Sequence, residues 1–139
     1  MIFALEITTY QDYGWDYEEE LFVLPEFQLI ENAIRKLDRY EHPFIILKLD
    51  NDFPGNEMNI MGGKGKYWID VLEGSEGELQ NHVIFDVEKS TEVVKIWESD
   101  QGFETYEFHL LDEISQAIEI AKYYFENKSL HPRFEWVTI

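Results

Sequence analysis

The chain has 139 residues, which is enough for one domain that buries roughly two thirds of the surface of its unfolded form. Hydrophobic residues make up 45% of the chain and aromatic residues 16%, and this composition excludes an intrinsically disordered protein despite the high charge. With 29 acidic and 11 basic residues the formal charge is −18, which argues against direct binding to nucleic acid or to an anionic membrane. The natural complement of such a chain is a basic partner.

The absence of cysteine excludes disulfides, thiolate nucleophiles and cysteine-ligated metal centres. No apolar run approaches about 18 residues, and the first residues lack the basic region, apolar core and cleavage site of a signal peptide. We therefore expect a soluble, cytoplasmic protein.

The first part of the chain predicts two strands separated by a loop and a helix. Residues 1–8 alternate between apolar and polar side chains, as in a half-buried strand. Residues 9–20 lose this alternation, and we expect a long ordered loop there. Apolar residues at helical spacing predict a helix over residues 25–40, and the apolar run of residues 44–49 predicts a central strand.

The middle of the chain predicts a meander of short strands. The glycine-rich residues 62–65 join residues 59–61 to residues 66–72 in the clearest hairpin of the sequence. Further strand patterns cover residues 82–87, 92–97 and 106–110.

The end of the chain predicts a second helix and a closing strand. Asp112 is a candidate N-cap, and the apolar stripe that follows it ends near Asn127. Residues 134–138 form the closing strand. The fold class that follows is α+β, a single domain with two helices packed on a mostly antiparallel sheet.

Motifs for metal and phosphate binding are incomplete. Residues 50–55 match part of a calcium loop, but Met61 stands where a bidentate glutamate is needed. Residues 62–65 lack the glycine spacing of a phosphate-binding loop, and a strand follows them instead of a helix. The histidines are scattered, and no serine lies in a nucleophile motif. We expect no catalytic, metal or cofactor site.

Acidic residues are concentrated in two segments that contain no Lys or Arg. Residues 1–34 contain eight acidic residues, and residues 98–119 contain seven. The first segment mixes carboxylates with large aromatic side chains, a composition suited to a basic, partly apolar protein surface. The alternatives are a solvated acidic loop with its aromatic residues in the core and, for the segment after Trp97, an ordinary charged turn. The predicted partner-binding residues are Asp12, Trp15, Asp16, Tyr17, Glu18, Glu19, Glu20, Trp97, Glu98, Asp100 and Glu104.

The order of features from about residue 44 onward is distinctive. Its anchors are the glycine hairpin of residues 58–67 and the C-terminal residues 125–136, where a helix closes with an aromatic pair, a polar turn and a strand carrying Trp136. Together with residues 47–49, 93–98 and 110–121, these segments resemble the first family of immunity proteins defined from bacterial polymorphic toxin systems. The chain departs from that family's pattern at residues 99–102, and residues 1–43 carry nothing specific to it.

The resemblance implies a small, cytoplasmic, non-enzymatic antitoxin. Members of that family bind and neutralise a cognate toxin domain, often a deaminase or nuclease directed at nucleic acid. The charge agrees, because such a toxin presents a basic substrate surface that an acidic inhibitor can occupy after fast, electrostatically steered association. Gly62, Gly63, Tyr67 and Trp136 are then structural positions, and the partner is the toxin's C-terminal domain.

Two other classes stay open at this point. A small acidic hydrolase with a carboxylate pair would show a deep pocket holding carboxylates of raised pKa. An acidic nucleic-acid mimic, or a general scaffold, would bind many basic partners weakly.

Overall fold

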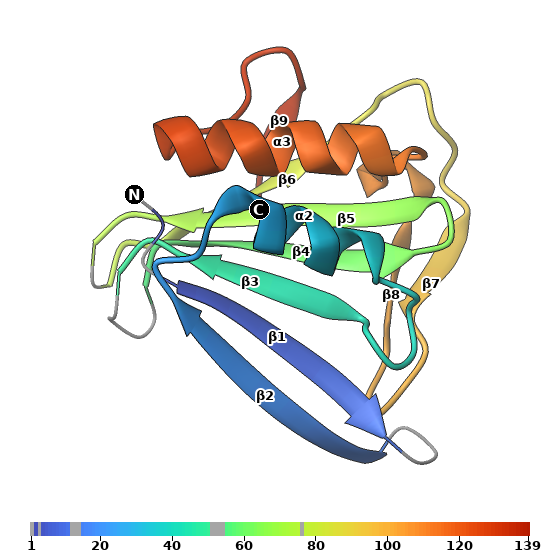
Figure 1. Ribbon diagram of the computed structural model, residues 1–139. Helices are drawn as coiled ribbons and strands as arrows, with labels where there is room; N and C mark the ends of the chain where they lie inside the picture. Colours follow the sequence, from blue (N-terminus) through green and yellow to red (C-terminus); the bar gives the residue numbers. More distant parts are fainter. Residues whose placement is uncertain (1, 3, 12–14, 51–54, 76) are drawn as a thin grey trace.

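A seven-stranded antiparallel sheet forms the centre of the molecule, as seen in the computed structural model (Figure 1), which describes residues 2, 4–11, 15–50, 55–75 and 77–139. Its strands follow one another in space as β2-β1-β3-β4-β5-β6-β9, so that β2 and β9 are the edges. Their bounds are β1 (Ala4–Gln11), β2 (Asp16–Val23), β3 (Phe44–Lys48), β4 (Glu57–Gly63), β5 (Lys66–Glu73), β6 (Gln80–Ile84) and β9 (Trp136–Thr138).

Two helices, α2 (Phe27–Arg35) and α3 (Ile114–Asn127), cover one face of this sheet (Figure 1). In α2 the buried residues Ile30, Ala33 and Ile34 recur at helical spacing, so one stripe faces the sheet. They pack with inward-facing residues of the strands, among them Leu47 and Ile60, into the main core. The predicted α+β class, with two helices on a mostly antiparallel sheet in one domain, is confirmed.

The opposite face of the sheet is covered only in part. A second, two-stranded sheet of β7 (Val93–Trp97) and β8 (Phe103–Tyr106) packs against it. A smaller apolar core, separate from the main one, joins the two sheets and consists of Trp68, Val83, Ile96 and Leu110. The expected meander is therefore correct for β4, β5 and β6 but wrong for β7 and β8, which leave the main sheet. We call the face that carries β7 and β8 the open face.

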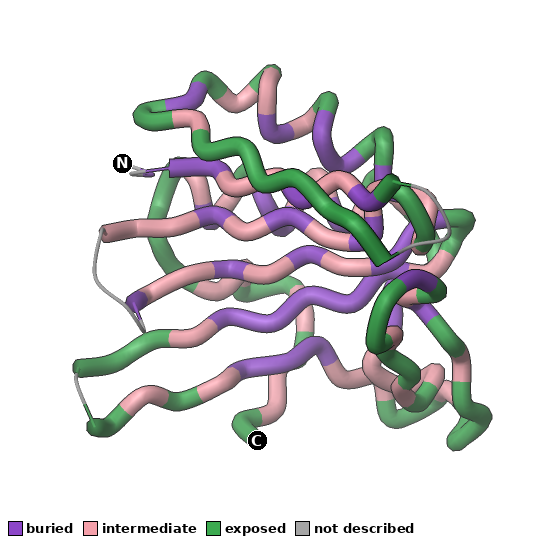
Figure 2. The backbone as a smooth tube through the Cα atoms, turned by 90° about the horizontal axis from the view of Figure 1, so that it is seen from below, coloured by how far each residue is buried: buried purple, intermediate pink, exposed green. Residues whose placement is uncertain are grey.

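The loop expected over residues 9–20 is wrong. β1 continues to Gln11, and β2 begins at Asp16 and pairs with β1 along its whole length. The alternation that marks a half-buried strand is missing because β2 is an edge strand that is exposed on both faces, as Figure 2 shows.

The first helix is shorter than the expected range of residues 25–40, because Arg39 forms hydrogen bonds with other segments. The helix ends at Arg35, and Arg39 adopts a positive φ of 70°. Its guanidinium donates to the carbonyl oxygens of Gly63 at 2.8 Å and Lys64 at 3.2 Å in the β4–β5 hairpin, and to Lys95 of β7 at 3.4 Å. Arg39 therefore ties the segment after α2 to both sheets.

Two expectations near the second helix are also wrong. Residues 107–109 form a short 3₁₀ helix, η1 (Glu107–His109), instead of continuing a strand, because the ring of His109 turns inward to bond the carbonyl oxygen of Ile84. Asp112 is not the N-cap of α3, a position that Glu113 occupies without a side-chain cap. Asp112 instead accepts hydrogen bonds from Lys66 at 2.6 Å and Lys89 at 2.9 Å.

Several smaller boundaries differ from the sequence pattern. The strand predicted over residues 44–49 is internal as expected and ends at Lys48, and the middle strand of the seven is β4. The closing strand is confirmed and is limited to Trp136–Thr138. In α3 the fully buried stripe comprises Ala117, Ile120, Ala121 and Tyr124.

In the described part of the chain, no helix has both the length and the apolar character needed to cross a membrane. The cytoplasmic location stays a prediction.

The glycine hairpin of β4 and β5 is confirmed, and its residues have two separate roles. Lys64 and Gly65 both have positive φ, 52° and 83°, as in the two-residue turns that match the twist of a hairpin. Gly63 makes a close backbone approach, because a Cβ at this position would lie 2.5 Å from the carbonyl oxygen of Leu37. The loop after α2 can dock on the hairpin only if residue 63 has no side chain.

This close approach predicts a strong effect of Gly63→Ala. The added methyl group would meet backbone atoms at a φ of +135°, and we expect a loss of about 3 kcal/mol in the free energy of unfolding. Gly77→Ala is the matched control, since φ is also positive there, at +81°, but nothing lies within 4 Å, and we expect a loss of about 1 kcal/mol. Urea unfolding of both variants measures the difference, and equal losses would contradict the role given to Gly63.

Candidate protein-binding surface

The edge strand β2 and its flanks expose an unusual amount of apolar surface. Trp15 is 72% exposed and Tyr17 is 54% exposed, beside exposed carboxylates. In the rest of this segment Leu21, Val23 and Leu24 are also more than half exposed. Exposed apolar side chains on a free sheet edge mark a surface that another chain can bind.

The pairing of β2 with β1 divides the predicted acidic run between two faces. Tyr17 lies opposite Tyr10, and Glu19 lies opposite Thr8, both on the open face. Glu18 and Glu20 alternate to the face that carries the helices. The acidic run therefore does not form one continuous patch, because a strand turns successive side chains in opposite directions. Asp16 is exposed at the start of the strand, and Asp12 lies outside the described residues.

A row of aromatic rings crosses the open face from β2 to β3. The ring of Tyr10 lies 5.4 Å from that of Tyr17 and 6.0 Å from that of Trp97, and the ring of Trp97 lies 5.2 Å from that of Phe44. We call these four residues the aromatic row. It joins the two segments that the sequence analysis selected separately, the one around Tyr17 and the one around Trp97.

Hydrogen bonds hold the turn after Trp97 beside β1. The phenol of Tyr10 donates to Asp100 at 3.0 Å, and burial together with this bond raises the pKa of Tyr10. The indole of Trp97 donates to Ser99 at 2.9 Å, and Ser99 donates to the carbonyl oxygen of Tyr40 at 2.7 Å. The carboxylate of Asp100 therefore lies beside Tyr10, within the aromatic row.

The remaining predicted residues lie at the margin of this surface. Glu98 is exposed, and its backbone amide donates to the carbonyl oxygen of Arg39 at 2.6 Å. Glu104 is exposed on β8 and faces Lys95 of β7 across the ladder, so a neighbouring positive charge offsets its own. Of the second predicted patch, Trp97 and Asp100 are the members that join the first.

A cavity of about 440 Å³ opens on the same face, next to the aromatic row. Two aromatic pairs flank it, Phe44 with Trp97 and Trp68 with Phe103, the rings of the second pair lying 5.3 Å apart. Asp70 of β5 also lines this cavity and is only 9% exposed. We call it the Asp70 cavity.

Burial raises the pKa of the Asp70 carboxyl, and hydrogen bonding from the side chains of Asn59, Asn81 and Trp68 offsets part of this rise. Burial also raises the pKa of Glu57, on the same face of the sheet, against the opposing effect of Lys48. Asp70 is not among the residues predicted from the sequence to form a site. The sequence indicates Asp70 in one way only, because it is a single carboxylate within the apolar residues 67–72. A carboxylate in a strand that is covered on both faces is shielded from water, and this is rare without a reason.

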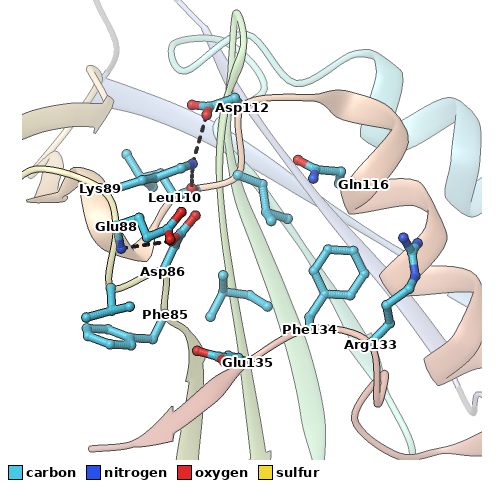
Figure 3. Close-up of a pocket in the computed structure, with 13 residues that line it drawn as sticks. Phe85, Asp86, Glu88, Lys89, Leu110, Asp112, Gln116, Arg133, Phe134 and Glu135 are labelled. Atoms are coloured by element: carbon cyan, nitrogen blue, oxygen red, sulfur yellow. Dashed lines mark hydrogen bonds and ion pairs between the residues drawn. The ribbon is translucent and has the colours of Figure 1, made fainter.

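A second cavity, of about 420 Å³, lies between residues 84–89, residues 110–112, Gln116 of α3 and residues 133–135 (Figure 3). Lys89 and Asp112, which line it, are bound to each other at 2.9 Å. Hydrogen bonds from Lys66 and Lys89 lower the pKa of Asp112. Both lysine-bound oxygens of Asp112 and the guanidinium of Arg133, which pairs with Glu119, have ionic partners within the protein, so we interpret this cavity as structural.

No group of three or more His, Asp or Glu side chains that could hold a metal ion occurs within the described ranges.

Comparison of the chain with models of protein families, with curated proteins and with solved structures found no match. The resemblance to the immunity proteins rests on the residues quoted for it.

The burial of Asp70 predicts a pH-dependent stability. The pKa of Asp70 is raised in the folded protein from its ordinary value of 3.8. At pH values between these two pKa values, Asp70 keeps its proton in the folded protein, whereas the unfolded chain has released it. Ionised Asp70 therefore costs stability above its raised pKa, and the cost disappears as the pH falls through it. We expect Asp70→Asn to be about 1 kcal/mol more stable than the wild type at neutral pH, with a smaller advantage at acidic pH.

Urea unfolding across this pH range measures the effect, with the exposed Glu126→Gln as a control that changes the charge equally. A constant difference between Asp70→Asn and the wild type at every pH would contradict the account.

Proposed function

We propose that this protein is an immunity protein that neutralises a cognate bacterial toxin domain by tight stoichiometric binding. The toxin domain is a deaminase or nuclease directed at nucleic acid, and the bound protein occludes its active site or its substrate surface. The observation that supports this most is the aromatic row beside the exposed apolar edge strand, on a chain of formal charge −18.

The composition of this surface suits a basic protein partner. Interfaces take their binding energy from a few aromatic anchors surrounded by a polar rim, and Trp15, Tyr17 and Trp97 provide such anchors. Glu19 and Asp100 lie on the same face and complement Lys or Arg side chains. A toxin that binds nucleic acid carries those side chains on its substrate surface.

Binding alone accounts for this function, and no chemistry is required of the protein. The alternative of a carboxylate-using hydrolase needs two carboxylates in one pocket, and Asp70 is the only one among the described residues that line its cavity. The second cavity is lined by Asp86, Glu88, Asp112 and Glu135, and Asp112 is held there in ion pairs with Lys66 and Lys89. The alternative of a general nucleic-acid mimic does not need an apolar edge strand, since charge suffices for it.

Co-expression with the toxin-like domain encoded beside its gene tests the proposal. We expect a one-to-one complex on pull-down and growth of cells that the toxin domain alone would kill. Neither complex nor rescue would refute the immunity function, and weak binding to many unrelated basic proteins would favour the mimic.

Reversal of charge on β2 should slow association with the toxin domain. The triple variant Glu18→Lys, Glu19→Lys, Glu20→Lys should reduce the association rate at low salt by about tenfold and weaken its salt dependence, because steering depends on local charge. The control reverses three exposed charges elsewhere, Glu88, Glu126 and Glu135, and so changes the net charge by the same amount. Equal association rates for the two variants in stopped-flow measurements would contradict a role for β2.

A further inference from the structure

The Asp70 cavity has the form of a binding site for a small group. Its volume of about 440 Å³ lies within the range of about 300–1,000 Å³ typical of ligand pockets. Its wall is mainly apolar and aromatic, and three polar side chains line it together, Asn59, Asp70 and Asn81. A few polar groups within an apolar wall are what orient a ligand in such a site.

The polar part of this cavity keeps buried acceptor atoms without a donor, although the side chains of Asn59, Asn81 and Trp68 donate hydrogen bonds to the Asp70 carboxyl group. Oδ1 of Asp70 and Oδ1 of Asn81 are buried, and neither accepts a hydrogen bond. Among the described residues, no Lys, Arg or His forms an ion pair with Asp70, and the nearby Lys48 is bound to Glu6 at 3.3 Å. Unpaired acceptors in a buried position are costly, and a ligand that brings donors and a positive charge removes that cost.

The residues that line the cavity favour one kind of cation as its ligand. A metal ion needs several oxygen or nitrogen ligands, usually more than one of them charged, and the cavity offers one carboxylate and the amides of Asn59 and Asn81 within a mainly apolar wall. A guanidinium group is planar, carries five N–H donors and stacks on aromatic faces, so it fits both the carboxylate and the rings of Trp97 and Trp68. It is also the cation that is least costly to remove from water.

The position of the cavity indicates where such a group comes from. Phe44 and Trp97 belong to the aromatic row and also line the cavity, so the cavity continues the surface that we assign to the toxin domain. We propose that the Asp70 cavity receives an arginine side chain of the bound partner, with the guanidinium against the Asp70 carboxylate and stacked on the aromatic walls. The choice of a protein side chain over a free guanidine rests on the proposed function.

The test uses the intact protein and small probes that need no toxin. N-acetyl-arginine amide carries the guanidinium, and N-acetyl-citrulline amide is its neutral isostere. We expect the arginine probe to shift the indole N–H signals of Trp68 and Trp97 in NMR titrations, and to bind at least about tenfold more tightly than the citrulline probe.

Two variants assign the binding to the cavity. Asp70→Asn should reduce the affinity for the arginine probe by about tenfold or more, and Phe103→Leu should reduce it by about threefold. The exposed Glu126→Gln should leave this affinity unchanged. Unfolding curves establish that each variant is folded. Equal affinity for both probes, no indole shifts up to about 50 mM probe, or full binding by Asp70→Asn would overturn the proposal.

Two further experiments distinguish a protein side chain from a free guanidine as the source of the guanidinium group. Propylguanidine, a free guanidine with the same single positive charge, should bind no more tightly than the arginine probe, and binding more than about tenfold tighter would overturn the assignment to a protein side chain. In the co-expression assay the Asp70→Asn variant should fail to restore the growth of cells that the wild type restores. If the wild type fails to rescue while the arginine probe still binds, the immunity function fails and the guanidinium site stands.

Discussion

The clamp formed by Arg39 determines the shape of the open face. Its backbone amide donates to Gly62 at 2.9 Å, its carbonyl oxygen accepts from Glu98 at 2.6 Å, and its guanidinium reaches Gly63, Lys64 and Lys95. One side chain thus joins the segment after α2, the β4–β5 hairpin and β7. Together with the hydrogen bonds of Tyr10 to Asp100 and of Ser99 to Tyr40, this clamp holds Trp97 beside Tyr10 and Phe44, where it is a common wall of the aromatic row and the Asp70 cavity.

The open face also combines features that a free protein does not need. It exposes apolar side chains along an edge strand, keeps a buried carboxylate without a cation among the described residues, and adds Glu19 and Asp100 to the surface of a chain that already carries −18. Each feature costs stability or invites aggregation, and each becomes favourable when a basic, partly apolar surface covers the face. One partner of that chemistry accounts for all three.

Much of the fold was readable from the sequence because its elements obey strong local rules. The glycine hairpin follows from the need for positive φ at Lys64 and Gly65, and both helices follow from apolar residues at helical spacing. β2 was missed because an exposed edge strand has no burial pattern to reveal it. The joining of Tyr17 to Trp97 and the exposure of Asp70 to a cavity depend on contacts between distant segments, which no local pattern encodes.

Hydrogen–deuterium exchange of the complex with the toxin domain tests the central claim, that the open face and its edge strand bind the partner. The account expects slower exchange of backbone amides in β2 and in residues 93–100 when the toxin domain is bound, and unchanged exchange in α3. Protection confined to α2 and α3, with β2 exchanging as fast as in the free protein, would contradict it.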